Sequence, residues 1–191
     1  MRKLGLASLA FFYCDFREDQ KNGLRGLLSS FLVQLCHQSD SYSDVLSALY
    51  MEHSNGSRQP SDNALIKCLK EILKLPGQAP VYLIIDAVDE CPITSSVSSP
   101  RDKVLMLVEE LIDSQVPNSR ICVTSRPETD IKGVLNPLTF RSISLHDEIG
   151  QMADIENYIK SVVNTDRIMR RWKMADKQLV IEVLTHKADG M

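Results

Sequence analysis

The sequence predicts an α/β fold, in which a parallel sheet is flanked by helices. Three short segments, at 9–15, 81–86 and 120–125, have the nearly continuous apolar pattern of strands that are covered on both faces. Segments with apolar residues at helical spacing alternate with them, and such alternation is typical of a parallel sheet. With 191 residues and 43% hydrophobic content, the chain is long enough to bury a sizeable core.

The first half of the chain is expected to form one strand and two helices before the second strand begins. The segment 9–15 is aromatic and apolar, and the turn signal Lys-Asn-Gly at 21–23 follows it. Apolar residues then recur at helical spacing through 24–35. A polar loop at 53–61 separates this helix from a second one through 65–73.

The second half begins with a helix that carries a clear start signal. Ser99 is a good N-cap, a proline occupies the first turn, and an acid stands at the third helical position. The strand at 120–125 comes next, and we expect a fourth strand at 140–145. Two helices, from about 151 and over 175–187, complete the pattern.

A change of pattern near 147–150 is the candidate domain boundary. Strands and helices alternate before it, whereas only helical periodicity follows it. We therefore expect an α/β domain over residues 1–147 and the start of a helical subdomain over residues 148–191.

Composition and charge argue against several classes of protein. The net charge of −3 and the absence of a dominant basic stripe disfavour binding to nucleic acid or to a membrane surface. No apolar run approaches the roughly 18 residues that a membrane span needs. The apolar start at 1–14 imitates a secretory signal but lacks a small-residue cleavage site. The five cysteines are widely spaced, which predicts reduced thiols in a cytoplasmic protein.

Three carboxylates stand close together in VYLIIDAVDECP, where the second strand ends. Asp86, Asp89 and Glu90 lie within five positions. Two like charges about 4 Å apart repel by about 4 kcal/mol at an effective dielectric constant near 20, so a compensating group is needed. In parallel α/β sheets, ligands bind outside the carboxyl ends of the strands. The acids therefore mark a candidate binding site.

The next strand ends in a polar and basic segment that could supply the compensation. Thr124, Ser125 and Arg126 follow the apolar residues of this strand. If the two strands are neighbours, Arg126 faces the acids across one strand spacing of about 4.8 Å. A crevice lined by carboxylates and an arginine fits a magnesium–phosphate ligand, because Mg²⁺ prefers carboxylates, water and phosphate oxygens.

These segments resemble a known family. LIIDAVDEC resembles the Walker B segment, and RICVTSRPE the sensor-1 segment, of NACHT domains, which belong to the signal-transducing STAND class of P-loop NTPases. FFYCDF followed by LRGLLSSFLVQLC is similar to the second strand and next helix of NACHT domains in fungal NLR-like and nephrocystin-related proteins. The resemblance covers about residues 7–190, and it implies a P-loop NTPase-like parallel sheet of strand order 5-1-4-3-2.

The resemblance also implies a role for each site residue. Asp86 would hold Mg²⁺ through water, and Asp89 and Glu90 would polarise the attacking water or sense the nucleotide. Arg126 would contact the terminal phosphate of Mg-ATP or Mg-GTP, next to Thr124 and Ser125 at the end of the same strand. Two simpler interpretations stay open: the acids cap the next helix and face solvent, or Arg126 forms a salt bridge with them.

The phosphate-binding loop of this family is absent from the sequence. A P-loop has the pattern G-x-x-x-x-G-K-[ST], whose backbone amides and lysine hold the phosphates. No glycine in the chain is followed by lysine. In the family this loop lies upstream of the strand at 7–15, so we expect a fragment that lacks the first strand and the P-loop. Such a chain is predicted to bind nucleotide weakly or not at all, and we do not expect independent hydrolysis.

Three functions are compatible with these features. The first is part of a signalling switch whose nucleotide state controls oligomerisation. The second is a nucleotide-free interaction or regulatory module, or a non-functional relic; such a module would contact protein partners or itself through an open sheet edge. The third, a Mg²⁺-dependent nuclease, is disfavoured because all three acids follow one strand and no basic groove is evident.

Overall fold

The computed structural model describes residues 6–15, 17, 23–94, 98–144 and 151–188. The chain divides into two compact units, residues 1–139 and 140–191. The boundary expected between residues 147 and 148 lies outside the described residues.

The first unit is built on a three-stranded parallel sheet with the strand order β1-β2-β3. The strands are β1 (Ser8–Tyr13), β2 (Val81–Asp86) and β3 (Ser119–Val123). Ser8 is aligned with Val81, and Val81 with Ser119, so the carboxyl ends of all three strands meet at one edge of the sheet. The predicted α/β fold with a parallel sheet is therefore confirmed.

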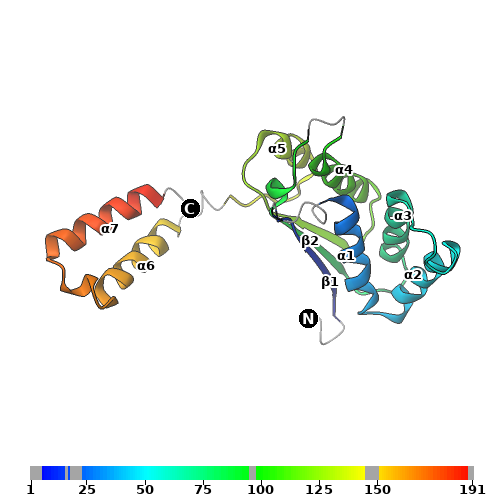
Figure 1. The fold of residues 1–191 in the computed structure, drawn as a ribbon, viewed down its shortest axis with the longest axis horizontal. Coiled ribbons are helices and arrows are strands. Elements are labelled where there is room, and N and C mark those ends of the chain that lie inside the picture. The colour runs from blue at the N-terminus through cyan, green and yellow to red at the C-terminus, as the bar shows by residue number, and fades with distance from the viewer. Residues whose placement is uncertain (1–5, 16, 18–22, 95–97, 145–150, 189–191) are drawn as a thin grey trace. The chain divides into compact units, whose positions relative to one another are not determined.

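Helices connect the strands and cover one face of the sheet (Figure 1). They are α1 (Leu24–Cys36), α2 (Asp40–Glu52), α3 (Asp62–Leu73), α4 (Pro100–Asp113) and α5 (Thr129–Leu135), with short 3₁₀ turns η2 (Val88–Glu90) and η3 (Asn136–Leu138). Fully buried side chains of α1, α3 and α4 form one core with Leu83 and Ile85 of the central strand. This core fixes the position of the strand that ends at Asp86.

The other face of the sheet is not covered by the described residues of the first unit. Along β2, Leu83 is completely buried whereas its neighbour Tyr82 is 42% exposed. Successive strand residues point to opposite faces, so Tyr82 shares its face with its register partners Leu9 and Arg120. Among the described residues of this unit, no helix packs on the apolar side chains of the second face, so the expected cover on both faces is present on one face here.

Two glutamines, Gln34 of α1 and Gln38 just after its end, close the outer edge of β1. The side-chain amide of Gln34 accepts a hydrogen bond from the backbone N of Phe11 (3.1 Å) and donates one to its backbone O (2.7 Å). Gln38 makes the same pair of contacts with Leu9, at 3.0 and 2.7 Å. These amides take the place of a further strand. Among the described residues, no strand pairs with the outer edge of β3.

Most predicted elements are present, and two predictions need correction. The start of α4 is confirmed, because Ser99 and Asp102 form a capping box. The side-chain oxygen of Ser99 accepts a hydrogen bond from the backbone N of Asp102, and the side chain of Asp102 accepts one from the backbone N of Ser99. Helix α2 was not expected from the sequence, because only Tyr42 among its residues is buried. The fourth strand expected at 140–145 is wrong over residues 140–144, which form neither strand nor helix; Leu145 lies outside the described residues. The sheet of the described residues contains β1, β2 and β3, and the segment is not part of it.

The second unit is a helical hairpin of α6 (Gln151–Thr165) and α7 (Met174–Ala188), joined through the 3₁₀ turn η5 (Met169–Arg171). Its small core contains Ile159, Val163 and Ile181. Across both units, no described helix is long and apolar enough to span a membrane.

Candidate functional site

A left-handed residue turns the chain at the end of β2 and separates the acids. Ala87 has φ 56° and ψ 51°, a conformation that is uncommon for residues other than glycine. The following turn η2 is anchored by Val88, which is completely buried. Asp86 therefore ends the strand, while Asp89 and Glu90 lie on the turn beyond it.

Thr124 ties the end of β3 to the end of β2 through backbone and side chain. Its backbone N donates to the carbonyl of Ile85, and its own carbonyl accepts from the N of Val88, both at 3.0 Å. Its hydroxyl accepts from the backbone N of Ala87 at 2.9 Å and donates to Oδ1 of Asp86. The Asp86 carboxylate is thereby oriented by a neighbour on the adjacent strand.

Arg126 compensates the charge of Asp89. The backbone N of Arg126 donates to Oδ1 of Asp89 at 3.0 Å, and its guanidinium Nε lies 3.4 Å from Oδ2. The Asp89 side chain is only 9% exposed, whereas that of Arg126 is 79% exposed. The salt bridge left open by the sequence is therefore present.

A second arginine, Arg101 at the start of α4, is buried and forms hydrogen bonds with the backbone of the acidic turn. Its side chain is 6% exposed. It donates to the backbone O of Asp89 and, at 3.3 Å, to that of Cys91. It also forms an ion pair with Asp130 of α5, with 3.1 Å between Nη1 and Oδ2. Sequence reasoning assigned no role to Arg101 or Asp130, because nothing in the spacing marks an arginine in a first helical turn as buried.

Two influences shift the pKa of the Asp130 carboxyl in opposite directions. Partial burial would raise it, but the hydrogen bond from Arg101 and the backbone amide of Ile131 outweigh that effect. The pKa of Asp130 is therefore below its ordinary value, and the carboxylate form is favoured.

Two buried cysteines next to the acids, Cys14 and Cys91, are in contact. Cys91 Sγ donates to Cys14 Sγ over 3.1 Å, and both residues are buried. The backbone N of Cys14 donates to the carbonyl of Asp86 at 3.0 Å, so this pair adjoins the end of β2. The hydrogen bond with Cys91, together with burial, raises the pKa of the Cys14 thiol. All five cysteines of the chain are free.

The acids do not form a metal site by themselves. In the part of the chain that the structure describes, no group of three or more His, Cys, Asp or Glu side chains could hold a metal ion. Asp86 offers one oriented carboxylate, while Asp89 is bound by Arg126. This donor set fits a magnesium ion that is held through water by Asp86 and takes further oxygens from a bound phosphate.

The remaining predicted residues lie beside these contacts. Glu90 is half-buried on η2, and Ser125 is exposed between Thr124 and Arg126. The structure thus brings Asp86 together with Thr124, and Asp89 together with Arg126. The chemical roles of all six residues stay predictions.

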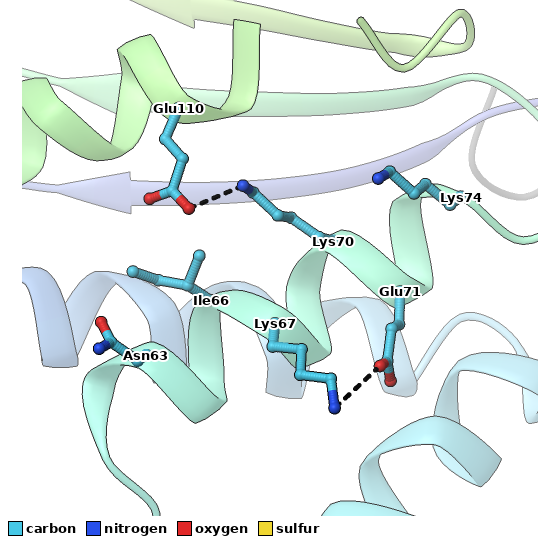
Figure 2. A pocket seen from close by; sticks show the side chains of 7 residues that line it. All are labelled: Asn63, Ile66, Lys67, Lys70, Glu71, Lys74 and Glu110. Carbon is cyan, nitrogen blue, oxygen red and sulfur yellow. Dashed lines mark hydrogen bonds and ion pairs between the residues drawn. The ribbon is translucent and has the colours of Figure 1, made fainter. Parts of the chain in front are cut away.

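Two hollows on the first unit lie away from the acids. One of about 430 Å³ lies between α3 and α4 (Figure 2), where Lys70 forms an ion pair with Glu110 at 2.7 Å. Lys67 on the same helix lies 3.8 Å from Glu71. Lys74 also lines the hollow, but no polar side chain of its lining is both buried and without a partner, and we assign no ligand to it.

The fold and the site define an α/β protein with an acidic, arginine-paired site at the carboxyl ends of two adjacent parallel strands. A family model described as "Nephrocystin 3, N-terminal" matches residues 2–126, which is more than half of the chain. The chain therefore belongs to the nephrocystin 3 N-terminal family, which confirms the nephrocystin-related part of the resemblance. Searches of the curated proteins and of the solved structures found no significant match.

Proposed function

We propose that this chain is the magnesium-side portion of a NACHT-type nucleotide-binding switch in a signalling protein. One observation carries the proposal: the segments that follow two adjacent parallel strands pair with each other, Asp86 with Thr124 and Asp89 with Arg126. Ligands of α/β proteins bind at this edge of a sheet. The neighbour relationships β1-β2-β3 also agree with those of the second, third and fourth strands in the order 5-1-4-3-2.

In this proposal, each residue contributes to one side of the nucleotide. Asp86, which Thr124 orients, would hold Mg²⁺. When bound, the ion neutralises the charge of the phosphate oxygens. Arg126 would contact the terminal phosphate, and Asp89 and Glu90 would polarise the attacking water or sense the nucleotide state. The Arg126 guanidinium is 79% exposed, which supports contact with a ligand outside the carboxyl ends of the strands.

We expect only weak nucleotide affinity for the chain alone. The sequence has no G-x-x-x-x-G-K-[ST] pattern, and in this class of protein that loop makes most of the phosphate contacts. Dissociation constants in the range of about 1 mM or weaker correspond to no more than about 4 kcal/mol of binding free energy. Tight nucleotide binding would therefore require a phosphate-binding segment outside these 191 residues.

A titration with Mg-ATP and Mg-GTP, followed residue by residue with amide NMR signals, tests the proposal. We expect small, saturable shifts confined to residues 86–90 and 124–126. The shifts should disappear in Asp86→Ala and persist in Glu110→Ala, a control at the pocket between α3 and α4. Absence of any shift at these residues at millimolar nucleotide, or shifts that Asp86→Ala leaves unchanged, would contradict the proposed site.

The uncovered sheet face and the open edge of β3 favour a second function, in which the chain is a protein-interaction module. The partner that we propose is a second copy of the chain. The uncovered face carries Phe11, Tyr13, Tyr82 and Ile84, an apolar and aromatic set. Parallel sheets are normally covered on both faces, and open edges invite pairing with another chain.

Light scattering over a range of protein concentrations tests this second function. We expect reversible dimers whose dissociation constant rises at least about tenfold in Tyr82→Lys, because a charge on the uncovered face would have to be desolvated. Tyr50→Lys changes an exposed tyrosine of α2 and is the matched control. A chain that stays monomeric at high concentration argues against self-association.

A further inference from the structure

The contact between Cys14 and Cys91 joins two segments that are distant in the sequence. Their sulfur atoms are 3.1 Å apart, and the residues are separated by 77 positions. Cys14 follows β1 directly, and Cys91 follows η2, the turn that carries Asp89 and Glu90. A covalent bond between them would tie the acidic turn to the end of the first strand.

The backbones on both sides of this contact are held by hydrogen bonds. The amide of Cys14 donates to the carbonyl of Asp86, and the amide of Cys91 donates to that of Val88, each at 3.0 Å. The carbonyl of Cys91 accepts from the buried Arg101. The two sulfurs are therefore held close together by the fold, and they need to approach by only about 1 Å to reach the disulfide bond length of about 2.0 Å.

The surroundings of the pair distinguish it from the other cysteines. Cys14 is 4% exposed and Cys91 is 1% exposed, so only an oxidant of nearly the size of water can reach them without a large opening of the fold. Cys122, by contrast, lies exposed on β3. Among the described cysteines, Cys14 and Cys91 are joined by a direct sulfur–sulfur contact.

We propose that Cys14 and Cys91 are a disulfide-forming pair, and that hydrogen peroxide converts their contact into a covalent link that fixes the acidic turn. In the first step, one sulfur attacks peroxide; the O–O bond breaks, an S–O bond forms, and water leaves after taking up a proton. In the second step, the other sulfur attacks the sulfenic sulfur; the S–O bond breaks, the S–S bond forms, and a second water leaves. Two thiols are oxidised and one peroxide is reduced to two waters.

This inference is independent of nucleotide binding. It requires only the positions of the two sulfurs, and it concerns the mobility of the turn that carries Asp89. Once formed, the bond closes a long loop and is buried, so it should raise the thermal unfolding midpoint and resist reduction more than an exposed disulfide does. We expect a rise in the midpoint of roughly 5–15 °C.

Treatment of the folded 191-residue chain with hydrogen peroxide, followed by alkylation and peptide mapping without reductant, tests the proposal directly. The expected result is a linked pair of peptides that contain Cys14 and Cys91, with loss of two hydrogen atoms from the intact monomer mass. Cys14→Ala should abolish the linked peptides and the rise in midpoint, while Cys122→Ala should preserve both.

Two other outcomes would overturn the proposal. In one, Cys14 and Cys91 remain alkylatable after Cys122 has been fully oxidised. In the other, the only disulfides found join Cys122 of two chains or involve Cys36 or Cys68. Because mapping of the unmodified sequence already gives the answer, instability of a variant does not prevent the test.

Discussion

The guanidinium of Arg101 lies between the acidic turn and α5, where its Nη1 donates to Oδ2 of Asp130 over 3.1 Å. The same side chain also donates to the backbone oxygens of Asp89 and Cys91. One buried cation thus connects the start of α4, the turn after β2 and the start of α5. The geometry of the candidate site depends on this residue, which does not itself belong to it.

Replacing Arg101 should destabilise the fold. In Arg101→Met, two backbone carbonyls and the Asp130 carboxylate lose their shared donor. The Asp130 side chain is 43% exposed and can be solvated, so the expected loss of about 1–3 kcal/mol comes mainly from the carbonyls left without a donor. Urea unfolding followed by circular dichroism gives the free energy of unfolding. Arg120→Met is the matched control, because the exposed Arg120 donates only to carbonyls of Pro117 and Ser119. A loss below about 1 kcal/mol in Arg101→Met would show that the network contributes little.

The Asp130 ion pair should make stability depend on pH in the acid range. The pKa of Asp130 is lowered in the folded state, so its contribution is complete above the unfolded-state pKa, about 4, and is lost as the pH falls through the lower folded-state value. Asp130→Asn should therefore reduce stability at pH 7 and flatten its decline below about pH 4. Asp44→Asn on the exposed side of α2 serves as the control. Parallel pH profiles for Asp130→Asn and the unmodified chain would contradict the prediction.

Removing the glutamines that close β1 should expose its backbone. In the double variant Gln34→Ala with Gln38→Ala, the amides of Leu9 and Phe11 lose their acceptors. We expect their hydrogen exchange to accelerate by at least about tenfold, which corresponds to about 1.4 kcal/mol of lost protection. The amide of Ser8, which donates to the carbonyl of Pro80, should change much less. Equal acceleration at all three amides would indicate global destabilisation instead.

Two serine N-caps provide a matched comparison of helix capping. The side chain of Ser99 caps α4, whereas that of Ser39 makes no capping hydrogen bond at α2. Ser99→Ala should reduce the free energy of unfolding by about 1 kcal/mol, and Ser39→Ala by clearly less. Thermal or urea unfolding measures both. Losses of the same size would show that the capping box does not stabilise α4 in solution.

The sequence predicted the elements whose signals are local and missed those that depend on tertiary contacts. Continuous apolar runs located β1, β2 and β3, and the Ser99 start signal located α4. Helix α2 buries little, so its apolar periodicity was too weak to be recognised. The segment at 140–144 has strand-like composition but no strand beside it, and β-structure requires a partner.

The candidate site was predictable only in part for the same reason. That Arg126 faces the acids followed from two strand ends being adjacent, and the ion pair with Asp89 is present. Arg101 and Asp130 are brought together by the packing of α4 and α5, which no spacing in the sequence encodes. The contact of Cys14 with Cys91 likewise depends on the register of β1 and β2.

The glutamine amides along β1 give the sheet one closed side and one open side. If two copies join through β3, the outer strands of the resulting sheet are both β1, and each already has its hydrogen bonds satisfied by Gln34 and Gln38. A further strand could then not pair with the backbone groups of β1 that these glutamines occupy. If the proposed association through β3 takes place, polymerisation through the sheet would terminate at two copies.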